Sequence, residues 1–302
     1  MYNGIMNVYK EAGFTSHDVV AKLRGICKQK KIGHTGTLDP DAVGVLPVCF
    51  GSGTKLCDML TDWDKEYITT LQLGLVTDTQ DISGQVLSKV DPEKLQVITG
   101  EQAAETVMSF LGEYDQIPPM YSALKVNGKK LYELARAGRE VERKPRRVQI
   151  KELEILEMSF PAVRFRVVCS KGTYIRTLCH DIGERLGCGG VMAALERSRV
   201  GIFGIDEALT LSQIERLRDE NKISSVIIPP DGVFAQCRAV KVTPDGRRLL
   251  ENGNRLPGRL LTKNESLHEA EKVRMYDGEG RFYGIYQYCS DRDEVRPVKM
   301  FL

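Results

Sequence analysis

The chain has 302 residues, of which 42% are hydrophobic and 28% charged, and its net charge is only +2. These values are typical of a soluble globular protein with two domains, and the charge does not by itself indicate a nucleic-acid-binding protein. No stretch is long and apolar enough to span a membrane, the first residues lack a signal peptide, and the eight cysteines and four histidines form no metal motif. We therefore expect a cytoplasmic protein with free thiols and no metal site.

The N-terminal residues predict a strand over 4–9 and a helix over 15–31. Thr15 or Ser16 can cap this helix, and Asp18 suits its positive end. The other side of the helix is basic. A basic helix face usually lies in solvent. Here the basic end of the helix leads directly into residues 33–53, which favours contact with phosphate groups.

Residues 33–53 are glycine-rich and almost uncharged, and we expect them to be irregular. The stretch contains Asp39-Pro40, and the proline pushes Asp39 out of the helical region toward an extended conformation. A carboxylate held in this way, beside the apolar run at 43–48, suits presentation to a substrate. An aspartate before proline also commonly begins a turn, so the local pattern leaves both interpretations open.

The next residues, 51–63, predict a helix whose N-terminus presents Lys55. Such an N-terminus can bind an anion, although the spacing of a phosphate-binding Walker loop is absent. The alternating residues 66–75 then predict a strand that starts near Tyr67.

A polar turn at 77–84 and a return strand near 85–90 follow. We expect Asp78 and Asp81 to stabilise this turn and to have no catalytic role. Residues 99–111 predict an amphipathic helix that buries Leu111.

Residues 125–147 carry nine Lys or Arg against three Glu, a local excess of +6. Tyr132 lies within this segment and Tyr121 just before it. Basic residues interleaved with aromatic ones are typical of an RNA-binding surface, although a solvated helix and loop would have the same composition.

Two paired strands are predicted at 148–158 and 162–170, followed by a helix over 173–186 that ends at Gly187. Arg176 falls in the first turn of that helix, where the helix dipole disfavours a cation. A carboxylate partner would offset this cost; the alternative is an ordinary surface arginine.

The last part of the chain predicts a helix at 210–218, a linker at 228–232 and a small β-rich domain over 235–302. Residues 1–232 would then form the first domain. The short strands and the hairpin near 276–281 are similar to those of the RNA-binding PUA domain, although a plain structural appendage would show the same pattern.

Seven short motifs occur in the order found in the TruB family of pseudouridine synthases, and together they make the chain resemble that family over its first two thirds. They are Thr15-Ser16-His17-Asp18, Gly33-His34-Thr35-Gly36-Thr37-Leu38-Asp39-Pro40, Gly53-Thr54-Lys55, Lys65-Glu66-Tyr67, Thr77-Asp78-Thr79, Tyr121-Ser122-Ala123-Leu124-Lys125 and Ser170-Lys171-Gly172-Thr173-Tyr174-Ile175-Arg176.

The resemblance implies an α+β fold with a mixed, mostly antiparallel sheet flanked by helices, and a basic lobe at about 115–147 that closes over RNA. It implies isomerisation of uridine to pseudouridine at position 55 of the tRNA T-loop by base flipping, without a cofactor. It also implies a monomer that needs no guide RNA.

The resemblance assigns the catalytic carboxylate to Asp39. Its partner would be Arg176, which should keep Asp39 charged by lowering its pKa. The target base would stack on Tyr67, while His34 would fill the gap that the flipped base leaves. Tyr174 and Lys55 complete the expected substrate-binding set.

Two other classes of protein remain as alternatives. An RNA-binding protein without activity would keep the basic segment but would not need Asp39. A base deaminase would need an HxE and PCxxC zinc signature, which is absent from the sequence. A change in RNA mass would indicate deamination, because isomerisation leaves the mass unchanged.

Overall fold

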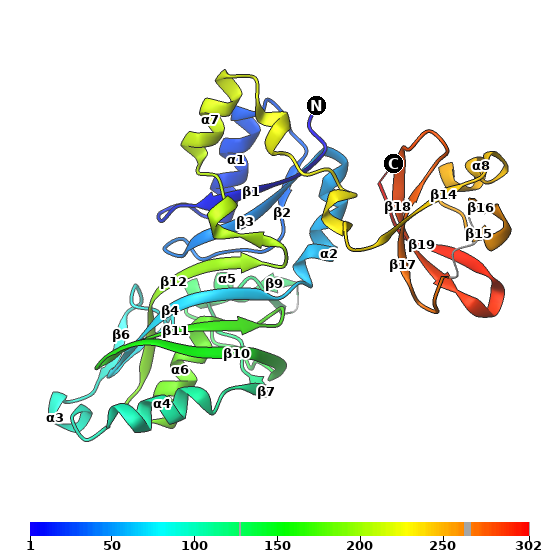
Figure 1. The fold of residues 1–302 in the computed structure, drawn as a ribbon. Helices are drawn as coiled ribbons and strands as arrows, with labels where there is room; N and C mark the ends of the chain where they lie inside the picture. Colours follow the sequence, from blue (N-terminus) through cyan, green and yellow to red (C-terminus); the bar gives the residue numbers. More distant parts are fainter. Residues whose placement is uncertain (127, 263–266, 302) are drawn as a thin grey trace.

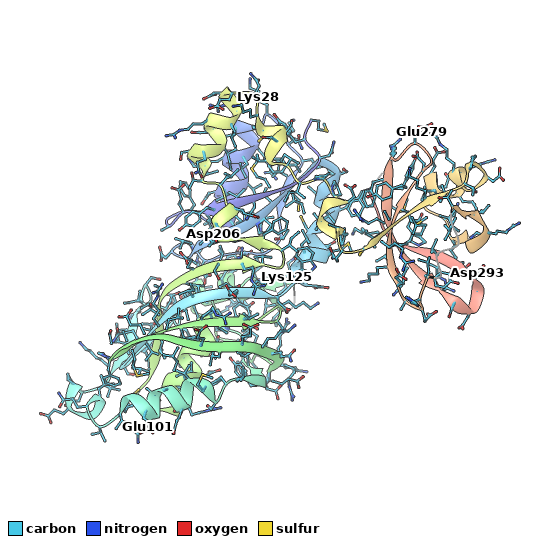
Figure 2. All side chains as sticks on the ribbon, in the orientation of Figure 1. Lys28, Glu101, Lys125, Asp206, Glu279 and Asp293 are labelled. Atoms are coloured by element: carbon cyan, nitrogen blue, oxygen red, sulfur yellow. The ribbon has the colours of Figure 1, made fainter. Side chains whose placement is uncertain are left out.

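The computed structural model describes residues 1–126, 128–262 and 267–301 and contains a large sheet and a smaller one (Figure 1). The larger part of the molecule is elongated, with Lys28 near one end and Glu101 near the other (Figure 2). The large sheet has nine strands in the order β1-β3-β12-β4-β11-β10-β7, with β2 paired to β3 and β13 to β12. The strands are β1 (Gly4–Lys10), β2 (Ile32–His34), β3 (Val43–Phe50), β4 (Lys65–Leu73), β7 (Gly112–Gln116), β10 (Arg146–Ser159), β11 (Ala162–Cys169), β12 (Gly190–Val200) and β13 (Phe203–Gly204).

Within the described part of this sheet, β3 and β12 form the only parallel pair. The predicted mixed, mostly antiparallel sheet is therefore confirmed. The alternation predicted for 162–170 is also correct, because Val163, Phe165 and Val167 are fully buried. Their neighbours Arg164 and Arg166 point to the other face.

The prediction that residues 33–53 are irregular is wrong for Val43–Phe50, which form β3 in the interior of the sheet. Seven of its eight residues are buried. A strand that is covered on both faces has a continuous apolar run. It therefore lacks the alternation of apolar and polar residues by which a strand is predicted from sequence.

Two helices pack together over one end of the sheet (Figure 1). They are α1 (Ser16–Ile26) and α7 (Leu211–Asp219). The hydroxyl of Thr15 accepts a hydrogen bond from the backbone of Asp18, whose carboxylate caps the Thr15 backbone in return. The helix predicted to reach residue 31 ends at Ile26, because Lys28 adopts a φ of 48°.

The other end of the sheet is covered by α4 (Gly100–Met108) and α6 (Ile175–Arg185), with α3 (Pro92–Leu95) at its edge (Figure 1). The predicted burial of Leu111 is wrong: its exposed fraction is 51%, while Phe110 is buried. Helix α4 ends at Met108, so Leu111 no longer follows the helical period.

Three smaller features surround the sheet. A hairpin of β5 (Leu75–Thr77) and β6 (Val86–Lys89) matches the predicted turn and return strand. The basic segment holds β8 (Lys125–Val126), β9 (Lys129–Lys130) and α5 (Leu131–Arg136). The helix predicted at 51–63 is split into a 3₁₀ helix, η1 (Gly51–Leu56), and α2 (Cys57–Thr61).

The C-terminal part forms its own six-stranded sheet, ordered β15-β19-β18-β17-β14-β16, which confirms the predicted β-rich region. It has its own apolar core, and a separate cluster packs Ile285 and Phe301 against Val45 and Leu56 of the larger part. The elements are β14 (Arg238–Val242), α8 (Arg247–Glu251), β15 (Leu256–Pro257), β16 (Leu261–Thr262), β17 (Lys272–Tyr276), β18 (Phe282–Cys289) and β19 (Glu294–Met300). The exact division of the chain at 232 and 235 stays a prediction.

Candidate active site

A cavity of about 770 Å³ opens beside the central strands of the large sheet. Segments that are far apart in the sequence meet in its wall. They contribute, among others, Thr35, Asp39, Lys65, Tyr67, Asp81, Ile82, Tyr121, Tyr132, Arg136, Tyr174, Arg176, Leu195 and Arg197. We call this space the central cavity; its volume falls within the range of ligand-binding pockets.

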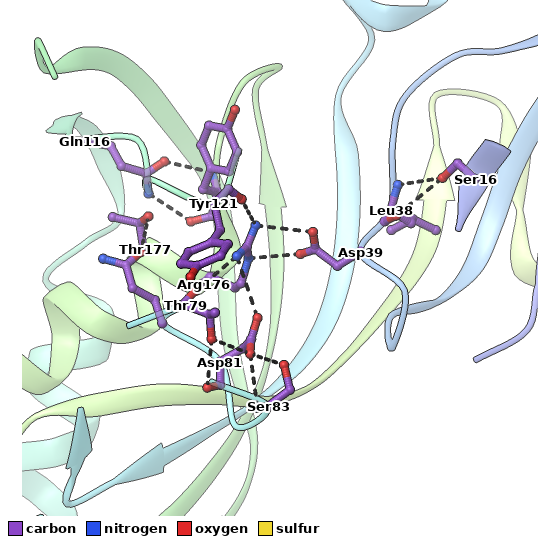
Figure 3. Close-up of polar contacts among 12 residues, drawn as sticks. Ser16, Leu38, Asp39, Thr79, Asp81, Ser83, Gln116, Tyr121, Arg176 and Thr177 are labelled. Carbon is purple, nitrogen blue, oxygen red and sulfur yellow. Dashed lines mark hydrogen bonds and ion pairs between the residues drawn. The ribbon is translucent and has the colours of Figure 1, made fainter. Parts of the chain in front are cut away.

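Asp39 lies in the loop between β2 and β3, and α1 holds this loop in place (Figure 3). The buried hydroxyl of Ser16 accepts a hydrogen bond from the Leu38 backbone at 2.9 Å. The Asp39 carbonyl accepts one from the Ala42 backbone at 3.2 Å. Both contacts leave the Asp39 side chain free to point into the central cavity.

Arg176 pairs with Asp39 through two contacts (Figure 3). Its Nε lies 3.0 Å from one carboxylate oxygen and its Nη2 lies 3.2 Å from the other. The same guanidinium donates to the carbonyls of Thr79 at 3.1 Å and Tyr121 at 2.8 Å. One arginine side chain, only 7% exposed, therefore joins the loop of Asp39 to two other walls of the cavity.

The protein surrounding Asp39 raises its pKa above the usual value for an aspartate, because burial disfavours the charged form. Arg176 opposes this effect, while the charge of Asp81 adds to it. The prediction that the arginine would leave Asp39 with a lowered pKa is therefore wrong in its net direction. The sequence gives no sign that Asp39 is buried. The effect of burial on its pKa is larger than the effect of the ion pair with Arg176.

Asp81 is a member of the site that sequence reasoning missed. It does stabilise its turn, as predicted, by accepting hydrogen bonds from Thr79 Oγ1 at 2.7 Å and Ser83 Oγ at 2.6 Å (Figure 3). Its other carboxylate oxygen lies 3.6 Å from Nη1 of Arg176. The nearby Thr77-Asp78-Thr79 motif was the available signal, but a loop role explained it fully.

Tyr67 on β4 lies directly opposite Arg197 on the neighbouring strand β12. Arg197 is 1% exposed and donates to the carbonyls of Val45 at 2.7 Å and Gly36 at 3.2 Å. Burial raises the pKa of Tyr67, and the positive charge of Arg197 partly offsets that rise. Arg197 was also missed, because its strand was not predicted.

Two buried lysines support the walls of the site. Lys10 donates to the carbonyls of Glu11, Phe14 and Pro40 at 3.1, 2.6 and 2.9 Å, and burial lowers its pKa to about 8. Lys65 contacts two carbonyls at the end of α2, and burial likewise lowers its pKa to about 8. Lys10 therefore fixes the residue that directly follows Asp39.

Tyr174 also lines the central cavity, at the start of α6. Its backbone N–H donates to Gln116 Oε1 at 2.8 Å, and its carbonyl accepts from Gln116 Nε2 at 3.0 Å. The structure thus brings Asp39, Tyr67, Tyr174 and Arg176 together, as the resemblance implied.

His34 and Lys55 do not line the central cavity. His34 lies on β2, edge to face with His17 at 5.4 Å between ring centroids, and burial lowers its pKa to about 4. Lys55 lies in η1, a 3₁₀ helix. The substrate-binding roles of both residues stay predictions.

The basic segment supplies the outer wall of the central cavity through Tyr132 and Arg136. The Tyr132 ring lies 5.3 Å from Lys130 Nζ and 5.4 Å from the Arg136 guanidinium. An aromatic ring flanked by cations suits contact with bases and phosphates.

Residues 1–126, 128–262 and 267–301 contain no cluster of three or more His, Cys, Asp and Glu side chains arranged to hold a metal ion. In the same residues, no helix is long and apolar enough to cross a membrane.

Comparison with known families gives two matches. Residues 24–175 match the N-terminal domain of the TruB family of pseudouridylate synthases. Residues 176–235 match the C-terminal domain of tRNA pseudouridylate synthase B. The second match ends before β14 begins.

Close relatives cover almost the whole chain. A tRNA pseudouridine synthase B of Lachnoclostridium phytofermentans is 52% identical over 99% of this chain and 100% of its own length. A tRNA pseudouridine synthase B of Clostridioides difficile is 42% identical over 99% of this chain and 100% of its own length.

Solved structures share the fold. The archaeal box H/ACA sRNP Nop10-Cbf5 complex contains a chain that is 25% identical with a TM-score of 0.72, over 99% of this chain and 86% of that one. An H/ACA RNP bound to a substrate RNA gives a TM-score of 0.73 at 24% identity, over 99% and 85%. The predicted fold type is therefore confirmed.

Proposed function

The chain belongs to the TruB family of pseudouridylate synthases, and from that premise we propose that it converts uridine to pseudouridine at position 55 in the T-loop of tRNA. The observation that carries this proposal is the carboxylate of Asp39, held against Arg176 in the wall of a cavity large enough for a nucleoside. The names of its relatives support tRNA as the substrate.

The reaction breaks the bond between N1 of the base and C1′ of the sugar, turns the base, and joins C5 to C1′. Nothing is oxidised and no group is lost, so the reaction requires no cofactor. It does require an ionised carboxylate near the sugar, and Asp39 fills this role. In this role Asp39 either attacks the sugar at C1′ or removes a proton from C2′.

The neighbouring side chains have distinct roles in this proposal. Arg176 orients the carboxylate of Asp39 and favours its charged form. Tyr67 stacks on the base and serves in proton transfer at C5. Tyr174 completes the wall, while His34 and Lys55 contact RNA outside the central cavity.

Extruding the target base from its stack costs a few kcal/mol. Phosphate contacts from the basic segment at 125–147 can offset this cost. We assign further RNA contact to the C-terminal sheet as a PUA-like domain over 235–302. We also propose that the protein is a cytoplasmic monomer. The full-length match to tRNA pseudouridine synthase B of two bacteria supports action without a guide RNA.

The test uses an unmodified tRNA transcript with wild type, Asp39→Asn and the matched control Asp206→Asn, since Asp206 is exposed and does not line the central cavity. Pseudouridine is mapped by carbodiimide labelling and reverse transcription, and RNA binding is measured in parallel. We expect Asp39→Asn to bind RNA but to lose about 10²- to 10⁴-fold or more in rate.

Each other outcome has a definite meaning. Full activity in Asp39→Asn would remove Asp39 from the mechanism. Modification at another uridine would refute the T-loop assignment. Binding by all three proteins without any modification would favour an RNA-binding protein or a requirement for a guide RNA.

A further inference from the structure

Two cysteines outside the central cavity lie in contact where β3 meets α2. Cys49 is a fully buried residue of β3, and Cys57 is the partly buried first residue of α2. Both pack in the apolar cluster that joins the large part of the molecule to the C-terminal sheet.

Gly33 makes room for this contact. It is paired with Cys49 across β2 and β3, and residues that are directly opposed in an antiparallel pair project to the same face. A Cβ atom at position 33 would lie 3.4 Å from the Sγ of Cys57. The sulfur of Cys57 therefore lies over the Gly33–Cys49 pair, on the face where the side chain of Cys49 points.

The surroundings make the two thiols differ in acidity. The neighbouring Cys49 thiol lowers the pKa of Cys57, with burial and Asp58 opposing and Lys299 assisting. The Cys57 thiol, together with burial, raises the pKa of Cys49. Lys299 reaches this place from the C-terminal sheet, and its Nζ lies 3.9 Å from Asp58 Oδ2. A cation beside a partly exposed thiol is typical of an oxidisable cysteine.

We propose that Cys49 and Cys57 form an oxidation site that a hydroperoxide converts reversibly into an intramolecular disulfide. The Cys57 thiolate attacks one peroxide oxygen, the O–O bond breaks, and the departing oxygen takes a proton from water to leave as an alcohol or water. The Cys49 thiol then attacks the resulting sulfenic acid, the S–O bond breaks, and water departs. Two thiols and one hydroperoxide thus give one disulfide, one alcohol and one water.

This site is connected to the catalytic loop. The Thr61 hydroxyl, at the end of α2, donates to the carbonyl of Thr35 at 3.2 Å and to that of Cys57 at 2.8 Å. A disulfide bond is about 2.0 Å long, so its formation draws the start of α2 toward β3. We therefore expect the oxidised protein to modify RNA several-fold more slowly and to recover when reduced.

The first experiment treats the full-length protein with hydrogen peroxide, alkylates the remaining thiols and maps the peptides by mass spectrometry. We expect two of the eight thiols to be protected and found in a Cys49–Cys57 linked peptide. Dithiothreitol should release both. Cys57→Ser should abolish the protection, whereas Cys289→Ser, at another partly buried thiol, should not.

A second variant keeps the test decisive. In Cys49→Ala the sulfenic acid of Cys57 has no partner, so dimedone should label Cys57 after peroxide treatment. No labelling there and no linked peptide in wild type would overturn the proposal. Linkage of Cys57 to Cys237, which packs on the same cluster, would overturn the assignment of the partner.

Activity is measured separately on the reduced and the oxidised protein. A disulfide that forms without changing the rate would refute the connection through Thr61. The linked peptide is detected whether or not the protein modifies tRNA, so failure of the proposed function cannot be mistaken for failure of the oxidation site.

Discussion

Arg176 contacts two carboxylates at once, those of Asp39 and Asp81, and both residues line the central cavity. Asp81 shares the guanidinium and faces its own turn. This arrangement holds Asp39 in one orientation while leaving part of its side chain, 37%, exposed. The balance between burial and the charge of Asp81 on one side, and the positive charges of Arg176 and Lys10 on the other, therefore decides the protonation state of Asp39.

This balance predicts the pH dependence of the reaction. Burial raises the pKa of Asp39, so the rate should fall on the acid side as pH drops through a pKa above the usual value of 3.8. In Arg176→Gln the opposing charge is gone, and the acid limb should move to higher pH by about 1–3 units. Single-turnover rates against pH check this, provided that RNA binding is saturated.

The control for this experiment is Arg166→Gln, since Arg166 is paired with glutamates on the same large sheet but does not line the central cavity. Its acid limb should match that of wild type. An unchanged limb in Arg176→Gln would mean that the ion pair does not set the charge of Asp39.

At the scale of elements, α6 lies so close to β12 that their backbones touch. A Cβ atom at Gly183 of α6 would lie 2.1 Å from the backbone nitrogen of Gly190 in β12. A Cβ at Gly190 would in turn lie 2.6 Å from the carbonyl of Cys179. This close packing determines where α6 places Arg176 relative to the loop of Asp39.

Gly183→Ala should therefore destabilise the protein, although alanine favours an isolated helix. We expect a loss of about 1–3 kcal/mol, the cost of overpacking a core. The matched control is Gly25→Ala in α1, where a Cβ meets nothing within 4 Å and should stabilise by about 0.4–1 kcal/mol. Denaturant unfolding measures both, and a stabilised Gly183→Ala would disprove the close contact.

For the whole molecule, charge is distributed unevenly. The chain carries +2, while residues 125–147 alone carry +6. Some of these cations are already paired: Arg147 contacts Asp115 and Glu113, and Arg143 contacts Glu140. Arg136, by contrast, lies at the outer wall of the central cavity beside the Tyr132 ring.

Arg136→Gln should thus weaken RNA binding and reduce the dependence of affinity on salt. Each lost phosphate contact lowers the slope of log K against log salt by about 0.7–0.9. Arg147→Gln serves as the control, because its guanidinium is neutralised within the protein. Equal slopes for Arg136→Gln and wild type would exclude a phosphate contact at this residue.

Short-range patterns predicted much of the fold. The alternation at 162–170 and the capped helices predicted at 15–31 and 210–218 correspond to β11, α1 and α7, although α1 ends at Ile26. Such signals depend on neighbours within a few residues, so they can be read along the chain. The resemblance to the TruB family likewise predicted four residues that line the central cavity together: Asp39, Tyr67, Tyr174 and Arg176.

Only the tertiary structure decided the rest. Arg176 and Asp39 are 137 residues apart, and their contact depends on α6 packing against β12. Burial of β3 on both faces removed its period, and burial of Asp39 reversed the direction of its pKa shift. Solvent exclusion and long-range packing produce these effects, and neither can be predicted from a local pattern of residues.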